Sequence, residues 1–164
     1  MNGKKHGKGK YYYEFGKLLF KGEYLNGLKW NGKIYDPNGI ITLIFENGNG
    51  KGKTYHKSGT LKYEGEFIKG KLNGKVKKYD SANDKDLVFE GEYFNGKRNG
   101  KGKEYKYSIF EGEYLDDKRY GKGKQYSYYH SRYSSSDGIR MEFEGEFLYG
   151  KKMDMEKNIV TKVY

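Results

Sequence analysis

The chain contains no cysteine, a single proline and few aliphatic side chains among its 164 residues. The absence of cysteine excludes a disulfide-stabilised scaffold and every zinc site built from thiolates. Leu, Ile, Val and Phe together make up about a fifth of the chain, close to the composition at which chains stay disordered. A large aliphatic core is therefore excluded, and we expect the 19 tyrosines to supply much of the buried apolar surface.

Long hydrophobic runs are also missing. No stretch approaches the roughly 20 apolar residues of a membrane span, and the first five residues lack the apolar core of a secretory signal. The length predicts a single domain. We therefore expect a cytoplasmic protein, with peripheral attachment to a membrane as the alternative.

Glycine, aromatic residues and positive charge are in excess, with 25 glycines and a formal net charge of +11. Such a charge attracts anionic partners, whether a lipid surface, a nucleic acid or an acidic protein. The chain is also rich in Asn, Tyr, Ile and Lys, as AT-biased codons would make it. Genome composition is thus an equal explanation for part of the charge.

The glycines and aromatic residues recur in one short phrase. Glu-Gly-Glu followed by Tyr or Phe begins at Glu64, Glu90, Glu111 and Glu144, and a fifth copy reads Lys-Gly-Glu-Tyr from Lys21. An aromatic residue precedes each copy, and a basic glycine phrase of the type Gly-Lys-Gly-Lys follows most copies. The basic unit has about 21 residues, and insertions lie between the units.

Each unit has the pattern of a β-hairpin. Phe89, Gly91 and Tyr93 share one face of a strand while the intervening glutamates share the other, which is the period of a half-buried strand. Asn-Gly pairs favour a short turn, which we place at residues 95–100. Scattered glycine disfavours helix. Residues 81–86 and 127–138 are predicted to be surface loops between units.

Glycine weakens a strand, so its recurrence requires a steric reason. An aromatic ring on a neighbouring strand can lie flat over the bare backbone of a glycine. Stacked units would then form an aromatic ladder that serves as the core or, alternatively, as a platform for a ligand or nucleobase. The ladder residues are Phe20, Tyr24, Tyr63, Phe67, Phe89, Tyr93, Phe110, Tyr114, Phe143 and Phe147.

The lysines of the basic phrase are predicted on the opposite face from the ladder. There they either pair with the repeat glutamates or contact an anionic surface, where each lysine contributes on the order of 1 kcal/mol. The candidate contacts are Lys51, Lys53, Lys75, Lys77, Lys101, Lys103, Lys122 and Lys124.

The phrases resemble the MORN (membrane occupation and recognition nexus) repeat, most clearly over residues 89–102. Residues 58–62 and the spacing from Gly102 to Tyr105 resemble the variant form of this repeat. The resemblance implies stacked hairpins in one elongated, twisted, antiparallel, single-layer sheet with a groove. About six units would occupy residues 1–154, the first of them truncated, and residues 155–164 would form a tail or a capping strand.

The resemblance also implies a non-enzymatic scaffold that binds a helix or strand of a protein partner in the groove or at the sheet edge. A module for phosphoinositides or anionic membranes is the alternative, and an antitoxin-like variant-repeat protein is a further one. One departure limits the transfer. Family repeats often have Trp where this chain has Tyr or Phe, and Trp30 lies in the irregular second unit.

The first residues begin within a hairpin, because residues 2–10 align with residues 95–103. An open sheet edge is a pairing hazard, so we expect either a piece of a longer repeat protein or an edge covered by a partner or a second copy.

No catalytic constellation, cofactor or metal site is predicted. Residues 48–54 resemble a phosphate-binding loop only as a copy of the basic repeat phrase. The three histidines show no metal-ligand spacing, and the glutamate pairs recur in every unit, whereas catalysis needs one pair. Nucleic-acid binding ranks last, because a structural repeat already accounts for the tyrosines and lysines.

Overall fold

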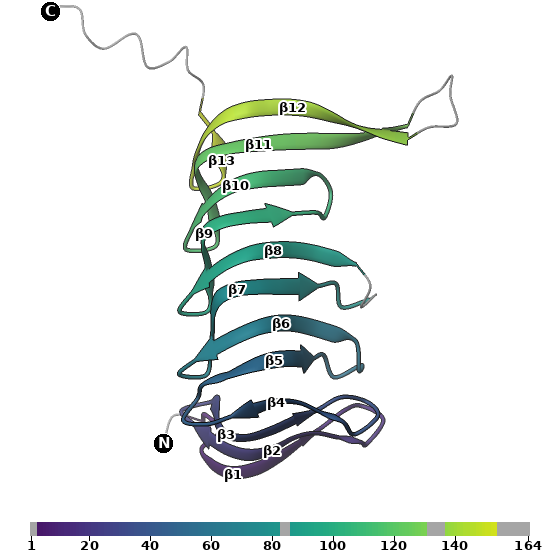
Figure 1. The fold of residues 1–164 in the computed structure, drawn as a ribbon, viewed down its shortest axis with the longest axis vertical. Helices are drawn as coiled ribbons and strands as arrows, with labels where there is room; N and C mark the ends of the chain where they lie inside the picture. The colour runs from purple at the N-terminus through teal and green to yellow at the C-terminus, as the bar shows by residue number, and fades with distance from the viewer. Residues whose placement is uncertain (1–2, 83–85, 131–136, 154–164) are drawn as a thin grey trace, which may run out of the picture. The chain divides into compact units, whose positions relative to one another are not determined.

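The computed structural model describes residues 3–82, 86–130 and 137–153. In this part of the chain the regular secondary structure consists of β-strands alone. The predicted all-β architecture of stacked antiparallel hairpins is confirmed (Figure 1). The strands are β1 (Gly7–Tyr12), β2 (Leu18–Leu25), β3 (Leu28–Tyr35), β4 (Ile41–Phe45), β5 (Gly50–Tyr55), β6 (Leu61–Ile68), β7 (Lys71–Tyr79), β8 (Leu87–Phe94), β9 (Lys97–Glu104), β10 (Ile109–Leu115), β11 (Lys118–His130), β12 (Asp137–Leu148) and β13 (Lys151–Lys152).

The chain divides into two compact units, residues 1–97 and residues 98–164. In the first unit, β1 to β4 form a four-stranded sheet in chain order, and β5 to β8 pair consecutively in another sheet. Only an isolated bridge between Glu46 and Asn49 lies between β4 and β5. The hydroxyl of Thr42 on β4 donates to the Lys53 carbonyl of β5 at 3.1 Å. The single sheet expected from the sequence is thus interrupted here.

In the second unit, β9 to β13 also pair consecutively and antiparallel. The prediction of a loop over residues 127–138 is wrong for residues 127–130 and 137–138, because β11 and β12 remain paired as far as His130 and Asp137. Residues 131–136 lie outside the described residues. Tyrosine and isoleucine favour extended backbone, and Tyr128 and Ile139 lie in the part of this hairpin that extends beyond the repeat unit. The predicted tail at residues 155–164 lies outside the described residues.

The hairpin turns are shorter than predicted. In the turn between β8 and β9, Asn95 and Gly96 have φ angles of 53° and 87°, as a two-residue turn of type I′ requires. Lys97 and Arg98 therefore lie in β9 and not in a loop. Turn amides also join successive hairpins, since Gly70 N donates to Gly48 O at 2.7 Å and Gly96 N donates to Leu72 O at 2.9 Å.

Aromatic rings packed on strand glycines form the core of each unit. Phe20 is fully buried, and a Cβ added at Gly22 would lie 2.8 Å from its ring. In the second unit the ring of Phe110 covers Gly112, on its own strand, and Gly123, on the next. Each buried ring contributes roughly 1.5–3 kcal/mol. Among the predicted ladder residues, Tyr63 and Phe143 are half-buried and the others are buried.

Two arginines and one carboxylate border the aromatic ladder of the second unit. The Arg119 guanidinium lies 4.4 Å from the centre of the Phe110 ring, and that of Arg98 lies 4.7 Å from the centre of the Tyr114 ring. Both arginines pair with Glu104, which also accepts a hydrogen bond from the Tyr114 hydroxyl at 3.0 Å. Burial raises the pKa of Tyr114, and the Glu104 carboxylate raises it further.

Candidate functional site

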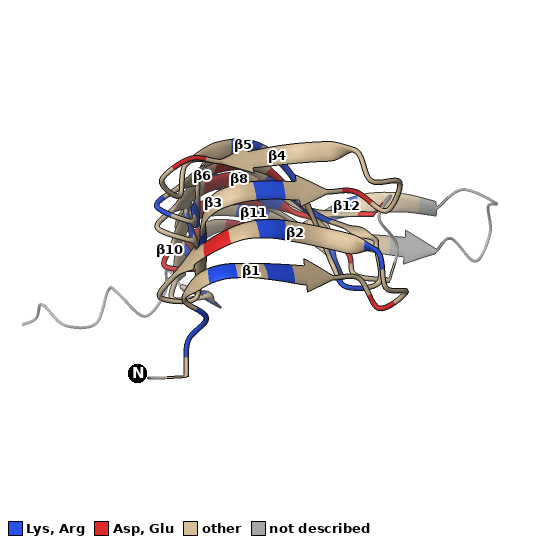
Figure 2. Ribbon diagram, turned by 90° about the horizontal axis from the view of Figure 1, so that it is seen from below, with Lys and Arg blue, Asp and Glu red and all other residues tan. Residues whose placement is uncertain are grey.

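The face of the sheets opposite the aromatic ladder carries the repeat lysines and glutamates, and we call it the charged face. Side chains alternate between the two faces of a strand, so the glycines and rings occupy one face and the charges the other. Figure 2 shows charged residues separated by uncharged ones along β1 and β2. The charged face is the exposed part of the repeat and hence the candidate interaction surface.

Opposite charges alternate across the strands of this face. In the first unit Lys53, Glu64, Lys77 and Glu90 lie opposite one another in succession from β5 to β8. Lys51, at one edge of this group, forms an ion pair of 2.9 Å with Glu66. The lysines are therefore balanced by carboxylates within the sheet.

The second unit repeats this arrangement. Lys103, Glu111, Lys124 and Glu144 lie opposite one another in succession from β9 to β12. Lys124 pairs with Glu144 at 3.1 Å and Lys103 with Glu111 at 3.8 Å. The hydrogen bond to Glu144 and the charge of that carboxylate raise the pKa of Lys124.

Every lysine proposed from the sequence as a contact to an anionic surface has a glutamate opposite it. Exposed pairs of this kind contribute about 0–1 kcal/mol each, so their main effect is on strand register and local charge. The face is consequently not a uniform cationic stripe along these strands. Lys51 faces Glu66, Lys53 faces Glu64, Lys75 faces Glu92, Lys77 faces Glu64 and Glu90, Lys101 faces Glu113, Lys103 faces Glu111, Lys122 faces Glu146, and Lys124 faces Glu111 and Glu144.

Exposed apolar side chains lie at one end of the charged strands. Ile68 and Phe94 in the first unit are 48% and 65% exposed, and Leu115 and Leu148 in the second are 36% and 39% exposed. Each directly follows the buried aromatic residue of a repeat phrase, so it projects from the charged face. We call these four residues the apolar row. Because these side chains recur at one repeat position, we treat the apolar row as a candidate contact surface.

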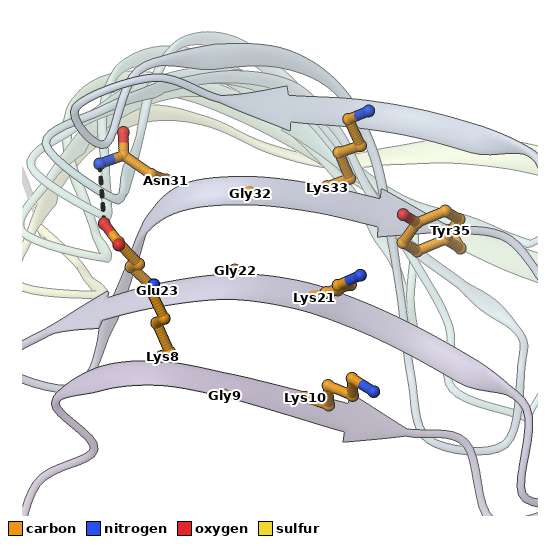
Figure 3. A pocket seen from close by; sticks show the side chains of 10 residues that line it. All are labelled: Lys8, Gly9, Lys10, Lys21, Gly22, Glu23, Asn31, Gly32, Lys33 and Tyr35. Atoms are coloured by element: carbon orange, nitrogen blue, oxygen red, sulfur yellow. Dashed lines mark hydrogen bonds between the residues drawn. The ribbon is translucent and has the colours of Figure 1, made fainter.

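The first sheet departs from the charge alternation. Lys10, Lys21 and Lys33 lie opposite one another on β1, β2 and β3. They border a hollow of about 910 Å³ on the charged face, which Lys8, Glu23, Asn31 and Tyr35 also line (Figure 3). The Glu23 carboxylate accepts a hydrogen bond of 3.1 Å from the Asn31 amide.

Several sequence features are not brought together into a chemical site. Residues 48–54 form a turn and β5 instead of a loop followed by a helix. Within the described ranges, no three His, Cys, Asp or Glu side chains are grouped as metal ligands. The same part of the chain contains no helix long and apolar enough to cross a membrane.

Two surface features were not predicted from the sequence: the apolar row and the cluster of lysines on the first sheet. Both nevertheless have a signal in the sequence. The residue after each complete repeat phrase is Ile, Phe or Leu, at the parity of the glutamates. The fifth phrase has Lys21 where the other copies have glutamate. The first signal indicates the apolar row, and the second indicates the cluster of lysines.

Comparison with family models gives a match to the MORN repeat at residues 1–14, 63–75, 89–108 and 110–128. These stretches include most of β1, β6 and β8 to β11. A search of curated proteins finds no match.

Proposed function

We propose that this chain, which matches the MORN-repeat model at four stretches, is a non-enzymatic scaffold for a protein partner. Its ligand is an α-helical segment of that partner, bound across the strands of the charged face. The observation that carries this proposal is the apolar row, in which each complete repeat exposes one apolar side chain at the same position.

The spacing of the apolar row suits a helix. Ile68 on β6 and Phe94 on β8 are two strands apart, as are Leu115 on β10 and Leu148 on β12. Strands lie about 4.8 Å apart, so two strands span roughly 9.6 Å. Residues seven apart on a helix are separated by about 10.5 Å and project in nearly the same direction. A helix with apolar residues every seven positions can therefore contact both members of a pair.

Charges beside the apolar row specify the flanks of that helix. Lys71 is opposite Ile68, Lys118 is opposite Leu115, and Lys151 is opposite Leu148. A helix whose apolar seam is bordered by Asp or Glu complements these lysines. We therefore expect a partner segment that is amphipathic and acidic beside its apolar seam.

Membrane binding through the eight repeat lysines has less support. Each of these lysines faces a glutamate across the sheet, so an anionic surface would have to compete with carboxylates already in place. No contact in the described residues favours the antitoxin-like alternative. Protein binding is accordingly the function that the geometry supports best.

The experiment that tests this proposal begins with a photo-reactive phenylalanine analogue at position 68, which cross-links the partner in a lysate and identifies the contacting segment. That segment, made as a peptide, is then titrated against the parent protein, Ile68→Glu and Phe94→Glu. Both positions are exposed, so folding should tolerate the change. We expect affinity to fall about tenfold or more in either variant, which corresponds to ~1.4 kcal/mol.

The matched control is Tyr107→Glu, which adds the same charge at a side chain that is 86% exposed and lies outside the apolar row. It should bind the peptide as the parent does. Equal affinity of the parent and both row variants would overturn the proposal, as would a bound peptide without helical circular dichroism.

A further inference from the structure

The lysine cluster of the first sheet results from one change in the repeat phrase. The copies that begin at Glu64, Glu90, Glu111 and Glu144 read Glu-Gly-Glu, but the copy on β2 reads Lys-Gly-Glu. The residue between Lys10 of β1 and Lys33 of β3 is consequently Lys21 and not a carboxylate. Three ammonium side chains thus follow one another across adjacent strands.

This arrangement is unfavourable for the isolated protein. Residues directly opposite in an antiparallel pair have Cβ atoms only about 4.5–5.5 Å apart, and like charges there destabilise the sheet. Within the described residues, no carboxylate forms an ion pair with Lys10, Lys21 or Lys33. Glu23, the acidic residue of the hollow, faces Lys8 and Asn31 in the next row. A bound anion would offset the repulsion that the sheet itself leaves in place.

The space beside the three lysines is suited to a small ligand. Gly9, Gly22 and Gly32 lie opposite one another and form the floor of the hollow. Figure 3 shows Lys10, Lys21 and Lys33 along one side of this floor, with Tyr35 near Lys33. The volume of about 910 Å³ is within the usual range for small-molecule sites, about 300–1,000 Å³.

We propose that this hollow binds a small polyanion with two or more phosphate groups, held by the ammonium groups of Lys10, Lys21 and Lys33. Lysine binds phosphate as a point charge with three rotatable donors, so a row of lysines can accommodate several phosphate oxygens. Lys8 adds a fourth positive charge at the opposite side, while the single carboxylate, Glu23, is hydrogen-bonded to Asn31. The site lies on the first sheet, away from the apolar row of β6 and β8, and does not depend on the scaffold function.

Calorimetric titration of the full chain with inorganic tripolyphosphate tests the proposal. The parent should bind with one site per chain, and Lys21→Gln should bind about tenfold more weakly, because hydrogen bonds between charged groups contribute of that order. The matched control is Lys77→Gln, which removes the same charge from a lysine that faces Glu64 and Glu90. It should bind as the parent does. Equal affinity in all three proteins, or an equal loss in both variants, would overturn the proposal.

The variant Lys21→Glu distinguishes the loss of the binding site from the loss of the folded structure. This change restores the phrase of the other repeats and places a carboxylate between two lysines, so it should raise the melting temperature while it abolishes tripolyphosphate binding. A variant that melts higher and still binds as tightly as the parent would contradict the site.

The source of the phosphate groups is distinguished by two further titrations. Phosphatidylcholine vesicles containing phosphatidylinositol bisphosphate should bind the parent, and not Lys21→Gln, if the ligand is a lipid headgroup. If the ligand is a soluble polyphosphate, tripolyphosphate binds and these vesicles do not. A single-stranded RNA that binds the parent more tightly than tripolyphosphate, with the same loss in Lys21→Gln, would refute the small-molecule assignment in favour of nucleic acid.

Discussion

At the scale of single residues, Lys29 on β3 lies in surroundings that disfavour its charge. Burial lowers the pKa of this lysine to about 8, and the positive charges of Lys62 and Lys5 act in the same direction. Its ammonium group lies 5.5 Å from the centre of the Phe20 ring, a contact that offsets part of the cost of desolvation. The side chain thus lowers stability at neutral pH.

Replacement of Lys29 by methionine should remove this cost. The folded pKa of about 8 is below the ordinary value of 10.5, so the native state binds fewer protons than the unfolded state between these values, and parent stability rises with pH there. At neutral pH the cost is present in full, and we expect Lys29→Met to be more stable by about 1–3 kcal/mol. Urea unfolding across this pH window should show the difference shrinking toward the upper value.

The matched control for this measurement is Lys53→Met, at an exposed lysine on the charged face. At neutral pH its stability should lie within about 0.5 kcal/mol of that of the parent, as is usual for an exposed substitution. A stability difference for Lys29→Met that does not change with pH would show that the ammonium group is not desolvated.

At the scale of the strand and hairpin, the repeating contact is between a glycine and an aromatic ring two residues earlier. Gly145 on β12 shows it most simply, because the three nearest atoms to an added Cβ all belong to Phe143, the closest at 2.6 Å. Contacts below 3 Å force a neighbour to move. The glycine is therefore required by the ring and not by the backbone at this position.

A double-mutant cycle tests this pairing. Gly145→Ala should destabilise the parent by about 1–3 kcal/mol through overpacking, and it should be neutral or slightly stabilising when Phe143 is already alanine. The coupling, measured by urea unfolding of the four proteins, should exceed about 1 kcal/mol. If alanine at position 145 costs the same in both backgrounds, the ring does not select the glycine.

Also at this scale, the sequence predicts the hairpins and their two faces, because alternation along a strand is a local property. It does not predict which charges meet, because pairing depends on register between strands. The ladder shifts between Gly112 and Glu113, so that Glu113 lies opposite Tyr120 on β11 and opposite Lys101 on β9. The interruption between β4 and β5 likewise concerns pairing between strands, which local alternation along one strand does not predict.

At the scale of the whole molecule, the net charge of +11 is not distributed evenly among the surfaces. Lysines of the complete repeats face glutamates, whereas Lys10, Lys21 and Lys33 face only one another among charged groups. The repeat thus provides a balanced, partly apolar surface for a protein and, where its phrase changes, a cationic hollow. The sequence predicts the excess of positive charge but not how it is distributed between these two surfaces. That distribution depends on which side chains become neighbours across strands, which composition does not record.

In the first unit, the proposed partner helix lies on the charged face along Ile68 and Phe94 of the apolar row. Hydrogen-exchange measurements on the protein, with and without the cross-linked partner peptide, test it most directly. We expect new protection at the strand ends and turns around Ile68 and Phe94 in the complex, together with protection of successive amides in the peptide as in a helix. Protection confined to the open edge at β1, with the peptide exchanging as an added strand, would contradict it.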